Sequence, residues 1–106
     1  MNDILDKAIE LLRQGFVKKV SNQHKVTKQT YCSDEMVKEP YAYNYCTIGA
    51  VFTACLIVGR EADYEIVLDR IRNSISRFSI AGFNDDPDTT VDDVIKILER
   101  SKLNAS

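Results

Sequence analysis

The chain has 106 residues, of which 44% are hydrophobic and 28% are charged, a composition typical of a soluble globular protein. This length favours a single domain over residues 1–106, and the apolar run at residues 45–58 is shorter than the ~20 residues that cross a bilayer. Because the sequence opens without a basic, apolar leader and has an odd number of cysteines, three, we expect no secretion signal, reduced thiols and a cytoplasmic location.

Two helices are predicted in the first 58 residues. The first begins at Asn2 or Asp3, both good N-caps, and ends at Gly15, with its apolar residues on one stripe. The second runs over about residues 41–58. Because the second half of this helix is apolar around its whole circumference, we expect it to be central and buried.

Residues 16–40 show the least regular pattern in the chain. Two short stretches of β-branched and aromatic residues, 16–20 and 26–31, favour a small β-hairpin, although the segment between them lacks the glycine of a tight turn. An excursion of this length between two helices is typically functional or partly mobile.

Two more helices are predicted in the C-terminal half. One spans residues 61–78. The other starts with Thr89 or Thr90 as N-cap, because each threonine is followed three residues later by an aspartate, as in a capping box. The acidic segment 83–88 predicts a polar loop between them. The predicted fold is therefore mainly α: a compact bundle of about four helices around the buried helix at 41–58, with room for a β-hairpin in 16–31.

Charge is unevenly distributed along the chain. Residues 11–33 include five basic residues and no acidic one, whereas residues 84–93 include five aspartates and no basic residue. Such a separation indicates two partner-facing surfaces, an electrostatic match inside the fold, or ordinary solvated faces.

One candidate for chemistry is Cys46, which lies near the start of the second predicted helix. The helix dipole can lower the pKa of a thiol at that position and so produce a nucleophile. A Cys–His enzyme also needs a base, which here could only be His24, with Asn84 or Asp85 orienting its ring. No glycine-rich turn precedes the cysteine, and cysteines in apolar helices are usually buried small hydrophobes, so we expect no catalytic residue.

The acidic segment also raises the question of a cation site, because hard cations prefer converging oxygen ligands. The spacing of an EF-hand is absent, and a single histidine with dispersed cysteines does not provide a zinc site. We therefore expect no metal and no cofactor. Asn84 and Asp85 are expected to bond backbone amides of the turn instead.

A set of short motifs runs through the chain: Cys-x-Ile-Gly-Ala in the second helix, then Phe-Asn-Asp, a threonine, and Val-x-x-Ile-Leu in the last helix. The residues concerned are Cys46, Ile48, Gly49, Ala50, Phe83, Asn84, Asp85, Thr89 or Thr90, Val94, Ile97 and Leu98. This set resembles the small bacterial and phage proteins classed as a domain of unknown function, DUF6197, which usually have tryptophan in place of Phe83. The resemblance covers almost the whole chain and implies a shared fold but no chemistry.

We predict a small non-catalytic module that binds another protein, since tyrosines in an irregular segment bury large area at low entropic cost. The resemblance further implies an accessory protein of a phage or mobile element that inhibits host machinery, such as a defence system. The predicted partner-binding residues are Lys18, Lys19, Lys25, Lys28, Tyr31, Tyr41 and Tyr43. The alternatives are the Cys46 enzyme, nucleic-acid binding through basic residues 13–28, which the acidic isoelectric point disfavours, and self-association into a homo-oligomer.

Overall fold

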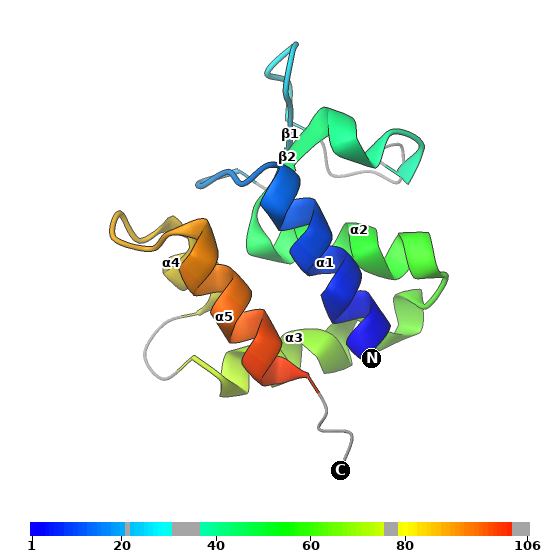
Figure 1. Ribbon diagram of the computed structural model, residues 1–106, viewed down its shortest axis with the longest axis vertical. Coiled ribbons are helices and arrows are strands. Elements are labelled where there is room, and N and C mark those ends of the chain that lie inside the picture. Colours follow the sequence, from blue (N-terminus) through cyan, green and yellow to red (C-terminus); the bar gives the residue numbers. More distant parts are fainter. Residues whose placement is uncertain (21, 31–36, 76–78, 103–106) are drawn as a thin grey trace.

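The computed structural model in Figure 1 describes residues 1–20, 22–30, 37–75 and 79–102. Most of these residues are helical, and one small antiparallel sheet accompanies the helices, so the predicted mainly α class is confirmed. In chain order the elements are α1 (Asn2–Gln14), β1 (Asn22–His24), η2 (Pro40–Ala42), β2 (Tyr43–Tyr45), α2 (Thr47–Val58), η3 (Glu61–Asp63), α3 (Tyr64–Asn73), α4 (Ile80–Asp85) and α5 (Val91–Ser101).

Helix α2 lies at the centre of the helical body. It packs most extensively against α1 and also contacts α3 and α4, while α5 covers α1 and α3 from another side (Figure 1). Every residue of α2 is buried or half-buried, as its apolar circumference predicts. Both α1 and α5 are amphipathic and turn their apolar stripes toward this core. None of the described helices is long and apolar enough to cross a membrane.

The central helix begins at Thr47, not near residue 41 as predicted. The preceding residues form a short 3₁₀ turn and then the strand β2, in which Tyr43 and Tyr45 are buried and Asn44 between them is only partly so. This alternation is the period-two pattern of a strand with one buried face. The strand has only three residues and continues directly into the apolar helix, which masked that pattern in the sequence.

The small sheet uses one strand from the predicted hairpin segment and one from outside it. Strand β1 pairs with β2 in antiparallel register, with Asn22 opposite Tyr45 and His24 opposite Tyr43. Within residues 22–30 the chain also folds back on itself, where Gln23 forms a bridge with Thr30. The main partner of β1 therefore comes from a distant part of the chain, and the turn falls at 25–27 instead of between residues 20 and 26.

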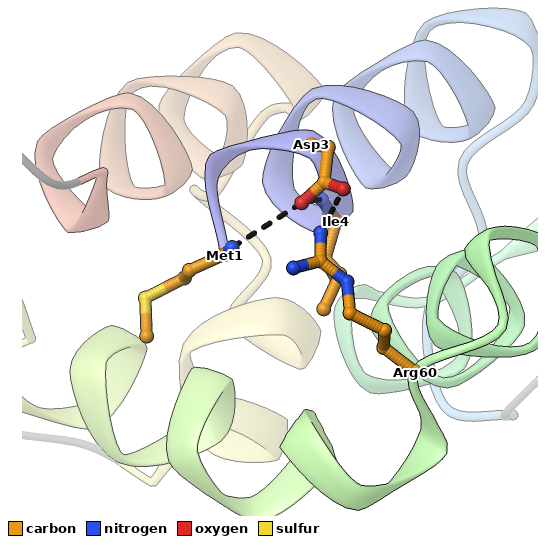
Figure 2. Close-up of polar contacts among 4 residues, drawn as sticks. All are labelled: Met1, Asp3, Ile4 and Arg60. Atoms are coloured by element: carbon orange, nitrogen blue, oxygen red, sulfur yellow. Dashed lines mark hydrogen bonds and ion pairs between the residues drawn. The ribbon is translucent and has the colours of Figure 1, made fainter.

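Asp3 holds the N-terminus of α1. It was predicted as a possible N-cap, but it lies inside the helix. One carboxylate oxygen of Asp3 accepts a hydrogen bond from the Ile4 amide at 2.9 Å and lies 3.2 Å from the Met1 nitrogen (Figure 2). The other oxygen pairs with the guanidinium of Arg60, just after α2. An acidic side chain is favourable in the first turn of a helix, and here it also ties α1 to the connection between α2 and α3.

Gly15 ends α1, as predicted, but the reason is space. Its backbone is extended, with a φ of 178°, a conformation open to any residue. A Cβ at this position would lie 2.2 Å from the Asn44 side-chain oxygen, because β2 passes close by. The Gly15 carbonyl accepts a hydrogen bond from the Tyr45 amide at 2.9 Å, which fixes this approach.

The C-terminal half contains one helix more than predicted. The predicted helix at 61–78 is η3 followed by α3, which ends at Asn73, and residues 76–78 lie outside the described part. The predicted polar loop at 83–88 begins with the last turn of α4, whose N-cap is Ser79. Helix α5 starts with the capping box of Thr90 and Asp93, one of the two predicted pairs.

Candidate functional site

A pocket of about 260 Å³ lies where the segment after α1, the start of α2 and helix α4 meet. Three residues that the sequence singled out, Cys46, Asn84 and Asp85, line it together. The other lining residues are Lys19, Val20, Ile48 and Ala81. The pocket therefore has polar groups at its α4 side and apolar groups along α2.

Asn84 joins three segments through one buried side-chain amide, which is only 2% exposed. Its oxygen accepts hydrogen bonds from the Thr47 amide at 2.8 Å and the Thr47 hydroxyl at 2.6 Å. Its nitrogen donates to the Val17 carbonyl at 3.2 Å and to Asp85 Oδ1 at 3.0 Å. Thr47 is the first residue of α2, so Asn84 satisfies a helix-end amide that has no partner within its own helix.

Asp85 connects α4 to the basic segment after α1. Its Oδ1 accepts from the Asn84 amide and from the backbone amide of Lys19 at 2.7 Å, and the Lys18 ammonium donates to the Asp86 carbonyl at 2.5 Å. The hydrogen bonds from the Asn84 side chain and the Lys19 backbone amide, with a smaller contribution from the charges of Lys19 and Lys18, lower the pKa of Asp85 below its usual value. At this point the basic and acidic segments contact each other through hydrogen bonds in which one partner is a backbone group, and the described residues show no ion pair between the two segments.

Cys46 is the N-cap of α2, where its sulfur accepts a hydrogen bond from the Gly49 amide at 3.3 Å. Burial is the largest effect on this thiol and raises its pKa above the ordinary value, although backbone amides at the helix start act in the opposite direction. The helix position therefore does not produce a low-pKa thiolate.

His24 lies on β1, and it is not among the residues that line the pocket. Its Nδ1 accepts hydrogen bonds from the amides of Val26 and Thr27, both at 3.1 Å, and its ring packs edge-on against Tyr43 at 5.1 Å. The structure thus brings Cys46, Asn84 and Asp85 together but not the histidine. Over the described ranges, no three His, Cys, Asp or Glu side chains gather closely enough to hold a metal ion.

A second candidate site is the projecting turn that follows β1 (Figure 1). The His24 amide donates to the Gln29 carbonyl at 2.9 Å, the Lys28 amide donates to the His24 carbonyl at 3.0 Å, and the Lys25 amide donates to the Ala42 carbonyl at 2.9 Å. Because the two strands are antiparallel and Lys25 is bonded to Ala42, the residue after Lys25 and the residue before Ala42 lie at the same end of the sheet. These residues are Val26 and Tyr41, whose side chains are 82% and 51% exposed.

We define the hairpin surface as Lys25, Val26, Lys28 and Tyr41. Sequence reasoning named three of these residues but missed Val26, the most exposed large apolar side chain among the described residues. The available signal was a single aliphatic residue within the polar run from Asn22 to Thr30.

The remaining predicted partner-binding residues differ in exposure. Lys19 is exposed and Lys18 is half-buried. Tyr43 is 8% exposed and belongs to the hydrophobic core, so we exclude it from the binding surface as a correction. Tyr31 lies outside the described residues.

The other motif residues mostly take part in packing. Gly49 and Ala50 are buried on α2, and Phe83 packs against the core from α4. Thr89 is buried beside the N-cap Thr90 of α5. These positions place the motif along the contact between α2, α4 and the start of α5.

No curated protein and no solved structure matches the chain. A family model described as a family of unknown function matches residues 1–102, nearly the full length. The motif residues from Cys46 to Leu98 all fall within this match. The chain therefore belongs to DUF6197.

Proposed function

We propose that this protein is a small non-catalytic module that binds another protein through the hairpin surface. The observation that carries the proposal is the 82% exposure of Val26 at the tip of a turn that projects from the helical body. Single exposed apolar residues are common on protein surfaces, but here Tyr41 lies at the same end of the sheet and is also exposed. A tyrosine beside an aliphatic tip is a composition that favours a protein interface.

The turn is already ordered before any partner binds. Two backbone hydrogen bonds close it, a third joins Lys25 to Ala42, and the His24 ring accepts hydrogen bonds from the amides of Val26 and Thr27. A surface whose backbone is fixed in advance loses less conformational entropy on binding, so more of the contact energy remains as affinity.

The properties of Cys46 and His24 support a non-catalytic function. Cys46 is half-buried, and this burial raises the pKa of its thiol, whereas a nucleophilic cysteine requires the opposite shift. The single histidine uses its Nδ1 within the turn and lies on a different element from the pocket. These observations favour binding over a Cys–His reaction.

The biological part of the proposal rests on the resemblance noted in the sequence. We propose an accessory protein of a phage or mobile element that acts in the cytoplasm and inhibits host machinery, such as a defence system. The free thiols of Cys46 and Cys55 suit a reducing compartment.

The proposal is tested with two matched charge substitutions, Val26→Asp on the hairpin surface and Ile66→Asp on α3. Ile66 is also exposed, at 52%, and α3 lies at the opposite end of the molecule from the turn (Figure 1). Tagged copies are recovered from cells that naturally hold the gene, and the bound proteins are identified by mass spectrometry. We expect a partner that wild type and Ile66→Asp retain and Val26→Asp loses, with melting temperatures within about 2 °C of each other. Retention by Val26→Asp, or equal loss with both variants, would contradict the proposal.

A further inference from the structure

The hairpin surface carries positive charge that remains without a carboxylate partner within the described residues. Lys28 forms no ion pair there, and the Lys25 ammonium is held by two uncharged oxygens of Gln14, its backbone carbonyl at 2.9 Å and its side-chain amide. Four other basic residues each pair with a carboxylate, Lys7, Arg60, Arg72 and Lys102, and the remaining described lysines and arginines do not. Lys25 and Lys28 are distinguished by lying beside the exposed Val26.

The acidic residue that contacts Tyr41 is Glu10, and its carboxylate does not compensate the charge of Lys25 or Lys28. Glu10 receives the Tyr41 hydroxyl hydrogen bond and also pairs with Lys7 at 2.8 Å, so its charge is already compensated. The chain itself has no acidic residue from Leu11 to Ser33. The charge of Lys25 and Lys28 is therefore available to a partner.

Lys28 also occupies an unusual backbone conformation. Its φ is 64°, in the left-handed region where glycine and asparagine are common and other residues are rare. Placing an L-residue with a long side chain there costs about 1 kcal/mol relative to glycine. Lys19 shares this conformation, with a φ of 69°, so it is not specific to the hairpin surface; it matters here because a substitution of Lys28 must tolerate a positive φ.

We infer that the hairpin surface binds an acidic protein segment, in which an apolar side chain covers Val26 and Tyr41 and carboxylates face Lys25 and Lys28. This inference rests on the proposed function and specifies the chemistry of the partner. Complementary charge around an apolar contact speeds association and suppresses wrong partners. A nucleic acid is less well matched, because an aliphatic tip does not stack on bases and the whole chain has a net charge of −2.

The inference is tested by selecting a library of displayed random peptides on the immobilised full-length protein, with Val26→Asp as the counter-selection. We expect the recovered peptides to be rich in Asp and Glu on both sides of an apolar residue. A synthetic copy of one such peptide should bind more weakly as salt increases, because ionic strength screens the exposed charges.

Lys28→Asn is the matched variant for charge, since asparagine tolerates a positive φ and the turn can stay intact. It should weaken the peptide about tenfold, or roughly 1.4 kcal/mol. Lys96→Asn, which removes an exposed lysine from α5, should leave the affinity unchanged. Circular dichroism of each variant establishes that the fold is retained.

The other outcomes separate the two proposals. Neutral or basic peptides that still require Val26 would overturn the acidic partner and leave the binding module standing. Failure to recover any Val26-dependent peptide would count against both. Single-stranded or duplex oligonucleotides that bind the protein, with Lys28→Asn weakening them and Val26→Asp having no effect, would replace the protein partner with a nucleic acid.

Discussion

Replacing Asn84 by alanine tests whether the pocket end of α4 stabilises the fold. The buried amide of Asn84 serves the Thr47 amide, the Thr47 hydroxyl and the Val17 carbonyl, and its loss leaves the Thr47 amide and the Val17 carbonyl without that partner. A buried polar group left unpaired costs about 1–3 kcal/mol. Allowing for relaxation around the new space, we expect Asn84→Ala to lower the free energy of unfolding by about 3 kcal/mol, a large part of the ~5–15 kcal/mol typical of a domain.

Urea unfolding followed by circular dichroism at neutral pH measures this loss. Asn73→Ala is the control, because Asn73 is an exposed asparagine at the end of α3 and its replacement should change stability by less than about 0.5 kcal/mol. A loss below about 1 kcal/mol for Asn84→Ala would refute the reasoning that this amide holds the three segments together.

Asn84→Asp adds a pH dependence with a defined sign. An ionised aspartate at this position keeps an acceptor for Thr47 but has no proton for the Val17 carbonyl, and it repels the Asp85 carboxylate, whose oxygen lies 3.0 Å from the Asn84 nitrogen. Burial and the like charge raise the folded-state pKa of the new carboxyl above its unfolded value. The variant should therefore be least stable at neutral pH and recover as the pH falls through that raised pKa, whereas the deficit of Asn84→Ala should stay constant between neutral pH and pH about 5, where Asp85 is ionised in both the folded and the unfolded state.

The wild-type protein provides the reference for that experiment. The folded-state pKa of Asp85 is lowered from 3.8, so its contribution to stability is fully present above that value and is lost only as the pH falls further, through the folded-state pKa. Between neutral pH and pH about 5 the stability of wild type should therefore change little on account of Asp85. A deficit of Asn84→Asp that did not vary over this range would show that the carboxyl is solvated and not buried.

Two further predictions concern α2. Thr53 is fully buried, and within the described residues its hydroxyl has no hydrogen-bond partner. Thr53→Val should therefore raise the free energy of unfolding, measured by urea unfolding, by about 1 kcal/mol. A destabilised variant would reveal a hydrogen bond to that hydroxyl. Cys46 has a thiol pKa raised by burial, so iodoacetamide at neutral pH should alkylate it far more slowly in the native protein than in urea, as followed by peptide mass spectrometry. Equal rates in the two states would contradict the raised pKa of this half-buried thiol and reopen the nucleophile hypothesis.

The elements that the sequence predicted well are those whose signals are local. The stripe of α1 and the capping box of Thr90 and Asp93 each lie within a few residues of one another. The burial of α2 follows from the absence of any polar face in its second half. In each case the sequence signal lies in the same segment as the structure it predicts, so contacts with distant segments did not change the predicted element.

The elements that the sequence missed depend on contacts between distant segments. Residues 43–45 are extended because β1 pairs with them, and nothing in the local composition separates this strand from the start of an apolar helix. Helix α4 is short and contains Gly82 and Asn84, both poor helix formers. It is retained because Ser79 caps it and because Asn84 bonds the start of α2. An isolated peptide of this sequence could keep the Ser79 cap but would lack the contact of Asn84 with α2.

The two candidate sites differ in the same way. The pocket brings together Cys46, Asn84 and Asp85, which the motif had already singled out. Hydrogen bonds from Asn84 and Asp85 to the start of α2 and to the segment after α1 hold these parts of the chain together. The hairpin surface arises only from the pairing of β1 with β2. A hairpin confined to residues 16–31 would leave Val26 and Tyr41 on unrelated segments, whereas the observed register places both at one end of the sheet. The proposed binding surface is therefore a consequence of long-range strand pairing, and a change that shifts that register should remove binding even if every residue of the surface is kept.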